Sequence, residues 1–189
     1  MNRHRPNIRQ RRPIFVGCEG ESERGYVTFL GRLAQQEGLS IQLDPVLLRP
    51  GGGDPCDLIE LAARKLSEKV RTRGIRYAAK MVLLDNDLIG QAPARDARGM
   101  QSAIQSGLEL IWQSPCHEAL LLRHLENCNT LRPPTTAIAQ DQLRQRWPTY
   151  EKGMAASQLI RKLDLAAVRR AALVEPSLAT LLQIIGLVT

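Results

Sequence analysis

Short apolar segments alternate with helical patterns along the first two thirds of this chain. Four such segments are rich in β-branched or other apolar residues: 13–18, 40–48, 77–84 and 108–112. Runs of this length are typical of buried strands, whereas the apolar residues between them recur at the three-to-four spacing of helices. This alternation predicts an α/β fold, with a mostly parallel four-stranded sheet flanked by helices and joined by right-handed crossovers.

Turn residues sharpen these boundaries. Asp54 and Pro55 provide a helix N-cap followed by proline at the first helical position, and Gly74 predicts the end of that helix. Pro45 removes a ladder donor, so the second strand is predicted to be an edge strand or a bulged one. The glycine-rich loop 49–53 is interpreted as a hinge. A phosphate cradle is the alternative, although the loop lacks the GxxxxGK[ST] pattern.

The last third of the chain has a helical pattern. Helices are predicted over 135–147 and 154–163, with further short apolar helices to residue 187. The terminal segment 171–189 is apolar enough to be buried, either within the chain or in an oligomer. A chain of 189 residues suits one domain. We therefore expect a single domain over 13–189, with 135–189 as a C-terminal helical extension packed on it.

Positive charge is concentrated at the N-terminus. The formal net charge is +7, but residues 1–12 contain five arginines and no acid, which leaves +2 for the rest. This basic arm has no apolar periodicity and is predicted to be disordered when free. Its natural partner is a polyanion such as nucleic acid, and a solubilising tail is the alternative.

Cysteine usage and hydropathy point to a cytoplasmic protein. The four cysteines show no CxxC spacing and no paired framework, which is typical of reduced thiols in the cytosol. No segment approaches the roughly 18 apolar residues that a membrane span needs, and the N-terminal arginines are not followed by a signal-peptide core. We expect a soluble protein without a membrane partner.

Acidic residues follow three of the predicted strands. Glu19 and Glu23 follow the first strand, Asp85 and Asp87 follow the third, and Glu118 lies one helical turn beyond the fourth. Singly, each has an ordinary structural explanation, such as a favourable charge at a helix N-terminus or a turn. Together they are expected to meet, because parallel strands end at one edge of a sheet.

Carboxylates crowded at one edge require a compensating cation, because like charges raise one another's pKa. Oxygen ligands without a histidine and cysteine set favour Mg²⁺ or Mn²⁺ over Zn²⁺. Such a site suits phosphoryl transfer or phosphodiester hydrolysis. Lys152 is a candidate cation for the transition-state phosphate if the C-terminal segment folds back over this edge, and a solvated surface lysine is the alternative.

Four motifs in this chain resemble the RloB-like family, which belongs to the Toprim-fold metal-dependent nucleases and is linked to restriction loci, phage defence and abortive infection. The motifs are FVGCEGESE, VLLDND, SPCHEALLLRHLE and YEKG. The family pattern has CEGxxTE after the first strand, a later DxD, a segment like NPCFExWLLLHF and a Y-x-K motif. It falls on Glu19, Glu23, Asp85, Asp87, Cys116, Glu118, His124 and Lys152, in the right order over about residues 13–153.

The chain departs from this pattern at several positions. Ser22 stands where the family usually has threonine, which keeps the hydroxyl, and Asn86 stands where arginine is frequent. His117, Ala119 and Leu125 stand where the family usually has aromatic residues. The acids are retained, but the lost aromatics would remove base-stacking platforms from a substrate groove.

The resemblance implies a Toprim-like nuclease that acts on RNA, with tRNA among the candidates, or on DNA. Glu19 would be a metal ligand or the general base, and Asp85 and Asp87 would be metal ligands. Glu23 and Glu118 would complete the acidic cluster.

The resemblance also implies that Lys152 steadies the scissile phosphate and that an ATPase partner subunit controls activity. A homo-oligomer is a further candidate assembly. His124 lies in a leucine-rich helical segment and is predicted to be a core histidine with its hydrogen bonds satisfied.

Two other functions remain open from the sequence. One is a non-catalytic subunit that binds nucleic acid or docks on an ATPase, for which the arginine arm and the apolar C-terminal helices argue. The other is a nucleotidyl transferase or primase-like enzyme on the same fold, which would need to bind a nucleoside triphosphate.

Overall fold

The structure, a computed structural model, describes residues 11–48 and 53–188. The predicted basic arm therefore lies outside the described residues except for its last two positions. Arg12 belongs to the first strand, one residue earlier than predicted. The predicted hinge lies outside the described residues except for Gly53.

The chain forms the predicted α/β fold around one all-parallel sheet with the strand order β2-β1-β3-β4. The strands are β1 Arg12–Cys18, β2 Ile41–Leu47, β3 Ala79–Asp85 and β4 Glu109–Gln113. The helices are α1 Glu21–Gln36, α2 Pro55–Arg73, α3 Pro93–Ser106, α4 His117–His124, α5 Thr136–Arg146, α6 Ala156–Leu159, α7 Leu165–Ala172 and α8 Pro176–Ile185.

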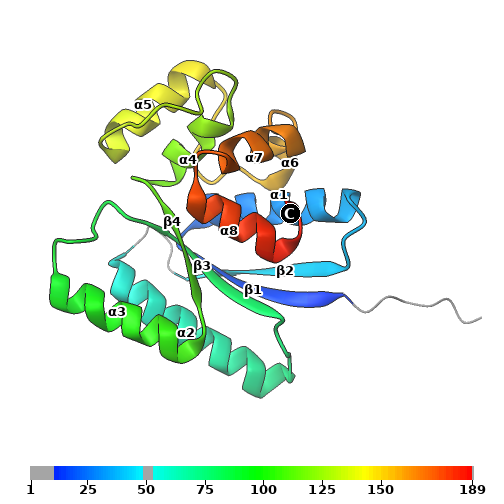
Figure 1. Cartoon of the computed structure of the whole chain (residues 1–189), viewed down its shortest axis with the longest axis vertical. Coiled ribbons are helices and arrows are strands. Elements are labelled where there is room, and N and C mark those ends of the chain that lie inside the picture. The colour runs from blue at the N-terminus through cyan, green and yellow to red at the C-terminus, as the bar shows by residue number, and fades with distance from the viewer. Residues whose placement is uncertain (1–10, 49–52, 189) are drawn as a thin grey trace, which may run out of the picture.

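Helices cover both faces of the sheet (Figure 1). α2 and α3 pack side by side on one face, while α1 and the C-terminal helices occupy the other. β1 shows the resulting alternation, because Phe15 belongs to the α2–α3 core and Val16 to the opposite core. Strands buried on both faces read as continuous apolar runs, which explains why the sequence marked them clearly.

Pro45 lies in an edge strand, as predicted. β2 pairs with β1 on one side, with Pro45 opposite Val16 in an uninterrupted register. The N-cap Asp54 accepts backbone hydrogen bonds from Cys56 and Asp57, and Gly74 adopts a left-handed conformation at the end of α2. Both helix boundaries follow from local chemistry.

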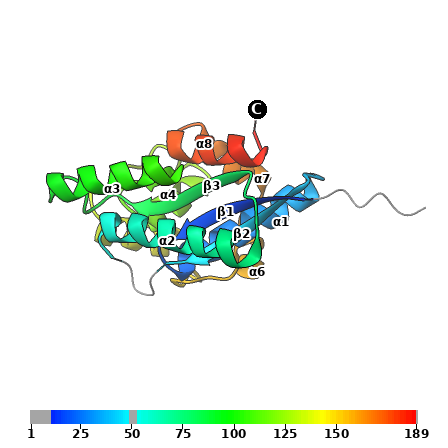
Figure 2. The same cartoon turned by 90° about the horizontal axis from the view of Figure 1, so that it is seen from below.

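Within the apolar C-terminal segment, α8 buries its apolar side chains in the core of the chain. Of the C-terminal helices, α8 lies at the top of the view in Figure 2 and α6 at the bottom. α8 packs against β4, and α6 packs against α1. Leu178, Leu181, Leu182 and Ile185 are all buried.

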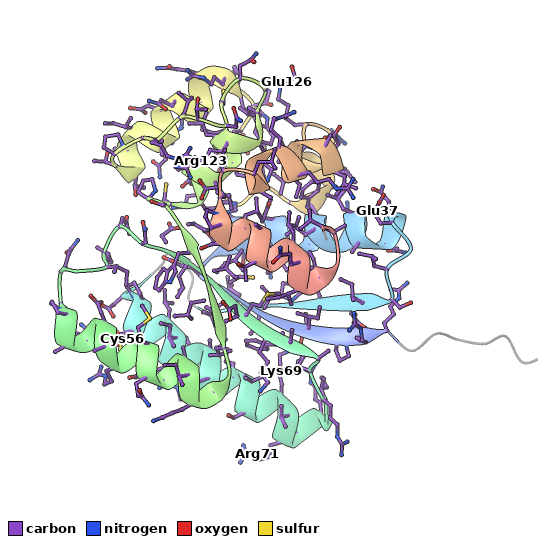
Figure 3. All side chains as sticks on the ribbon, in the orientation of Figure 1. Glu37, Cys56, Lys69, Arg71, Arg123 and Glu126 are labelled. Carbon is purple, nitrogen blue, oxygen red and sulfur yellow. The ribbon has the colours of Figure 1, made fainter. Side chains whose placement is uncertain are left out.

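Arg123 on α4, labelled in Figure 3, connects α4 to the start of α8. Its buried guanidinium lies 3.0 Å from Glu175 at the N-cap of α8 and donates to the carbonyl oxygens of Ser114 and Leu131. A charge buried this deeply needs such partners.

The helix predicted over 154–163 is regular only over Ala156–Leu159. Ala155 is extended as the N-cap, and Asp164 accepts a hydrogen bond from Ala167 as the N-cap of α7, so the chain leaves the helix before that residue. The four cysteines are free, as predicted. No helix in residues 11–48 and 53–188 combines the length and the apolar character that crossing a bilayer requires.

Candidate active site

One cavity of about 630 Å³ lies at the carboxyl edge of the sheet. Its lining contains all six residues that the sequence singled out for catalysis: Glu19, Glu23, Asp85, Asp87, Glu118 and Lys152. They come from four separate stretches of the chain, at residues 19–23, 85–87, 118 and 152. The structure therefore brings the whole predicted set to one place, while the chemical role of each residue stays a prediction.

Glu19 and Asp85 are in direct contact. Cys18 pairs with Leu83 in the parallel register of β1 and β3, so the two strands end at nearly the same height. The Oε2 atom of Glu19 accepts a hydrogen bond from the backbone N–H of Asp85 at 3.2 Å. The two acids thus face one point above neighbouring strands.

Glu23 is held in place by the start of α1. Gly20 is the N-cap, and its backbone N–H donates to Glu23 Oε2 at 2.8 Å. The other carboxylate oxygen lies 3.9 Å from Nδ1 of His117. Glu23 is buried, so this hydrogen bond and the positive end of the α1 dipole offset part of the cost of its charge.

Asp87 and Glu118 each accept a hydrogen bond from a side-chain hydroxyl in the last third of the chain. Thr136 Oγ1 donates to Asp87 Oδ2 at 2.9 Å. The hydroxyl of Tyr150 donates to Glu118 Oε1 at 3.4 Å. The segments after α4 therefore complete a site whose acids come from the sheet edge, α1 and α4.

Lys152 lies at the rim of the cavity, because the segment 150–153 folds back over the sheet edge. The backbone N–H of Gly153 donates to Ser22 Oγ at 2.9 Å. Ser22, which stands where the family usually has threonine, thus uses its hydroxyl to hold this segment. The Lys152 side chain is exposed.

The N-termini of four helices also meet at this cavity. α1 contributes Ser22, α2 Pro55, α4 His117 and α5 Thr136 to its lining. The positive ends of the helix dipoles favour anions, and backbone N–H groups there bind phosphate well. They moderate the repulsion among the acids and make the cavity suitable for a phosphate group.

Burial and neighbouring charges raise the pKa of two acids here. Burial raises the pKa of Glu19 to about 7, with smaller contributions from Glu23 and Asp87. Burial raises the pKa of Asp85 to about 9, with the charges of Glu23, Glu19 and Glu118 adding to it. Without a cation, these groups retain protons at pH values where free carboxyl groups have lost them.

The donor set fits a hard divalent cation. Asp85 Oδ1 is buried and has no hydrogen-bond partner among the described residues, so a cation would satisfy it. The ligand atoms of Glu19, Asp85 and Asp87 do not all lie within 4.8 Å of one another. Mg²⁺ usually binds through one or two carboxylates together with water and substrate phosphates, so the three acids need not all be direct ligands at once.

Asp54, Cys56 and Asp57 form a different group that could hold a metal ion. Among the described residues, theirs is the one set of three potential ligands whose donor atoms lie within 4.8 Å of one another. The two aspartates also pair with Arg95, whose Nη2 atom lies 2.8 Å from Asp57 and 3.5 Å from Asp54. This arginine already supplies the positive charge that the aspartates need.

Comparison with known proteins adds one positive finding. The family model described as "RloB-like protein" matches residues 14–181. The chain belongs to the RloB-like family. Neither the curated proteins nor the solved structures that were searched contain a match.

In this RloB-like chain, the motif residue His124 has the structural role predicted for it. Nδ1 donates to the carbonyl oxygen of Leu120 at 2.8 Å, so Nε2 accepts from the hydroxyl of Tyr26, also at 2.8 Å. Burial lowers the pKa of His124 to about 4, which keeps the ring neutral. The histidine joins α4 to α1 behind the cavity and does not line it.

Three polar residues line the cavity of this RloB-like chain although the sequence pattern gives them no role in the site. The sequence predicts a helix cap at Asp54 and a helix that contains Thr136, and His117 is one of the departures from the family pattern; all three line the cavity. Their positions at predicted helix N-termini were the available signal, because those ends point toward the carboxyl edge of the sheet.

Proposed function

We propose that this protein is a divalent-metal-dependent nuclease that hydrolyses phosphodiester bonds of RNA, with tRNA among the candidates, or of DNA. The observation that carries the proposal is the convergence of Glu19, Asp85 and four other predicted site residues on one cavity. Family membership supports it, because the resemblance to the RloB-like family implies a Toprim-fold metal-dependent nuclease. The four helix N-termini at the cavity suit the phosphate groups of such a substrate.

Glu19, Asp85 and Asp87 would hold Mg²⁺ or Mn²⁺. When bound there, the metal ion supplies an activated water and neutralises charge on the departing oxygen. General base is the alternative role for Glu19: in the metal-free site partial burial raises its pKa to about 7, so it can accept a proton close to neutral pH. Glu23 and Glu118, both buried, complete the negative charge that favours a divalent over a monovalent cation.

Lys152 would bind the scissile phosphate. Its segment is tied to the acidic cluster at two points, through Gly153 to Ser22 and through Tyr150 to Glu118. A cation held at the rim stabilises charge that develops on the phosphate in the transition state. Loss of one such preorganised contact typically lowers the rate by about 10²–10³.

A role in phage defence under the control of an ATPase partner follows from the family resemblance and forms part of this proposal. Two arms are needed to test it. The isolated protein shows whether the site is active, and reconstitution with an ATPase from the same locus shows whether activity depends on the partner. A homo-oligomer would appear in the mass of the isolated protein in solution.

The direct test is cleavage of tRNA, single-stranded RNA and plasmid DNA with Mn²⁺, Mg²⁺ or chelator. We expect the wild-type protein to cleave at least one substrate with metal only, and Glu19→Gln and Lys152→Gln to reduce cleavage by about 10²-fold or more. Asp141→Asn is the matched control, because Asp141 is an exposed acid on α5 outside the cavity. Equal cleavage by wild type and Glu19→Gln would show that the proposal is wrong.

A non-catalytic docking subunit is the second candidate. Leu173 is 85% exposed and lines a cavity formed by α7 and α8 together with Leu187 and Val188, and apolar residues gathered on a surface in this way are found at protein interfaces. This candidate predicts nucleic-acid or ATPase binding that survives Glu19→Gln and Asp85→Asn, with no cleavage in any metal. The nuclease proposal predicts metal-dependent turnover from the same samples.

A further inference from the structure

A second cavity lies at the far ends of α4 and α5. It has a volume of about 760 Å³, and three cationic side chains from different segments line it: Arg146, Lys162 and Arg170. Arg146 ends α5, Lys162 lies between α6 and α7, and Arg170 belongs to α7. Figure 1 shows α4, α5 and α7 together at the end of the molecule opposite α2 and α3.

These cations are available to a ligand. Within the described residues, none of the three has a carboxylate oxygen within 4.0 Å. Arg170 is held in position by a 2.6 Å hydrogen bond from Nη2 to the carbonyl oxygen of His124, and its buried Nε has no partner among the described residues. Arg146 is exposed and donates from Nη1 to its own helix at Gln142. Most of the guanidinium donors are therefore left for an anion.

Two acids also line this cavity, and they differ in what they can do. Asp164 is the N-cap of α7, where its Oδ1 accepts the backbone N–H of Ala167 at 2.7 Å. Glu126 is exposed at the rim, near the ends of α4 and α7 (Figure 3). The charge of Asp164 is partly compensated by α7, whereas that of Glu126 opposes an anionic ligand.

The second cavity is linked to the acidic site by two packed helices. α4 begins with His117 and Glu118 at the acidic cavity and ends with His124 at the second one. α5 likewise begins with Thr136 at the acidic cavity and ends with Arg146 at the second one. At 1.5 Å per residue, the two sites are about 10–15 Å apart along these helices.

We propose that this second cavity binds phosphate groups of a polynucleotide whose strand also reaches the acidic site. The ligand chemistry is a phosphate held by arginine and lysine, as at other nucleic-acid contacts. The inference rests on the proposed function in taking the nucleic-acid substrate as the ligand. It assigns to Arg146 and Lys162 a role in affinity, separate from the chemistry at Glu19 and Asp85.

The test measures binding of a labelled single-stranded oligonucleotide of about twelve nucleotides, a length that covers one typical binding site, over a range of salt concentrations. The protein is the full chain with its arginine arm, in chelator, so that no cleavage occurs. We expect Arg146→Gln/Lys162→Gln to weaken binding several-fold. It should also reduce the slope of log K against log salt by about 0.7 for each lost phosphate contact.

The matched control is Arg144→Gln/Arg161→Gln, which removes two exposed arginines that lie within two residues of the tested positions but outside the cavity lining. This control should bind nearly as well as wild type, and Glu126→Gln should bind more tightly. Thermal unfolding of each variant checks the fold, which all should keep because these side chains are exposed. Equal losses in the cavity variant and the control would overturn the inference, as would absence of binding by the wild type.

Inorganic phosphate and a nucleoside monophosphate distinguish the source of the phosphate. Either should compete weakly with the oligonucleotide. If they bind as tightly as it does and depend on Arg146 and Lys162, the ligand is a small phosphorylated molecule and the polynucleotide assignment is wrong. Failure of the nuclease proposal is separately visible, because a protein that cleaves nothing can still lose binding in the cavity variant.

Discussion

Asp85 carries the strongest electrostatic conflict in the candidate site. Its carboxylate ends a central strand, is largely shielded from solvent, and faces the charges of Glu23, Glu19 and Glu118. One of its oxygens has no hydrogen-bond partner among the described residues. Strain of this kind is typical of residues kept for function, because a neutral side chain would be more stable at the same position.

Asp85→Asn should therefore separate stability from function. The pKa of Asp85 is raised to about 9 in the folded protein, far above its value in the unfolded chain, so the folded state holds a proton that the unfolded state has lost. The stability contribution of this group is fully present at low pH and is lost as pH rises toward 9. In chelator, the free energy of unfolding of Asp85→Asn should exceed that of wild type increasingly between pH 5 and pH 9.

Denaturant unfolding across this pH range measures the difference, with Asp141→Asn as the exposed control that should show none. Metal-dependent cleavage by Asp85→Asn should fall by about 10²-fold or more. A stability difference that stays flat with pH would contradict the assignment of a raised pKa to Asp85.

Gly25 on α1 allows the backbone next to Lys152 to pack directly against this helix. A Cβ atom added to Gly25 would clash with the carbonyl oxygen of Met154, which no side chain tolerates without a backbone shift. This close approach lets the segment 150–153 reach over the sheet edge. Helix packing thus determines where the exposed lysine stands.

Gly25→Ala should be destabilising, although alanine is normally favoured over glycine in a helix by about 1 kcal/mol. We expect a loss of about 1–3 kcal/mol, as for other overpacked sites, together with weaker cleavage because Lys152 moves. Gly31→Ala on the same helix is the matched control, since its Cβ would meet Leu43 at an ordinary 3.9 Å. That variant should be neutral or stabilised, and a Gly25→Ala protein as stable as Gly31→Ala would contradict the packing argument.

The molecule as a whole places its acids where two central strands end. The order β2-β1-β3-β4 makes β1 and β3 neighbours, and both helical layers shield their residues from water. Four helices direct their N-termini at the same edge. A divalent cation at this edge would relieve repulsion among groups that belong to distant parts of the chain, so its effect should be seen in global stability.

Mg²⁺ or Mn²⁺ should raise the midpoint of thermal unfolding of wild type. A cation present at 100 times its dissociation constant stabilises a folded protein by about 2.7 kcal/mol. The increase should be larger at pH 8 than at pH 6. The pKa values of Glu19 and Asp85 are raised to about 7 and about 9, so at the higher pH fewer protons compete with the cation for these carboxylates.

Glu19→Gln and Asp85→Asn should reduce this stabilisation strongly. Asp57→Asn tests the second group of potential ligands near Arg95, and it should leave the metal effect unchanged. If Asp57→Asn abolishes the effect and Asp85→Asn does not, the metal ion binds at Asp54, Cys56 and Asp57 instead.

Local patterns in the sequence predicted most of the secondary structure. Pro45 marked an edge strand, Asp54 and Gly74 marked the ends of α2, and the apolar runs marked all four strands to within about two residues. α6 was predicted too long, because the caps at Ala155 and Asp164 outweigh the apolar spacing between them. These features depend on residues close together in the chain, so the sequence shows them directly.

The candidate site was predictable in part for a similar reason. Residues that follow parallel strands must gather at one edge, so Glu19 and Asp85 could be expected to meet once the strands were recognised. Lys152 entered through its motif. Asp54 and Thr136 were missed as cavity residues, because no local pattern states which helix ends face the acids.

From its own residues, the chain specified the alternation of strands and helices and the acids at the strand ends, since each is encoded within a short segment. The strand order, the return of residues 150–153 over the sheet edge, and the meeting of Arg146, Lys162 and Arg170 depend on packing between segments far apart in the chain. Long-range packing leaves no periodic trace in a single sequence. For that reason the second cavity became visible in the folded molecule alone.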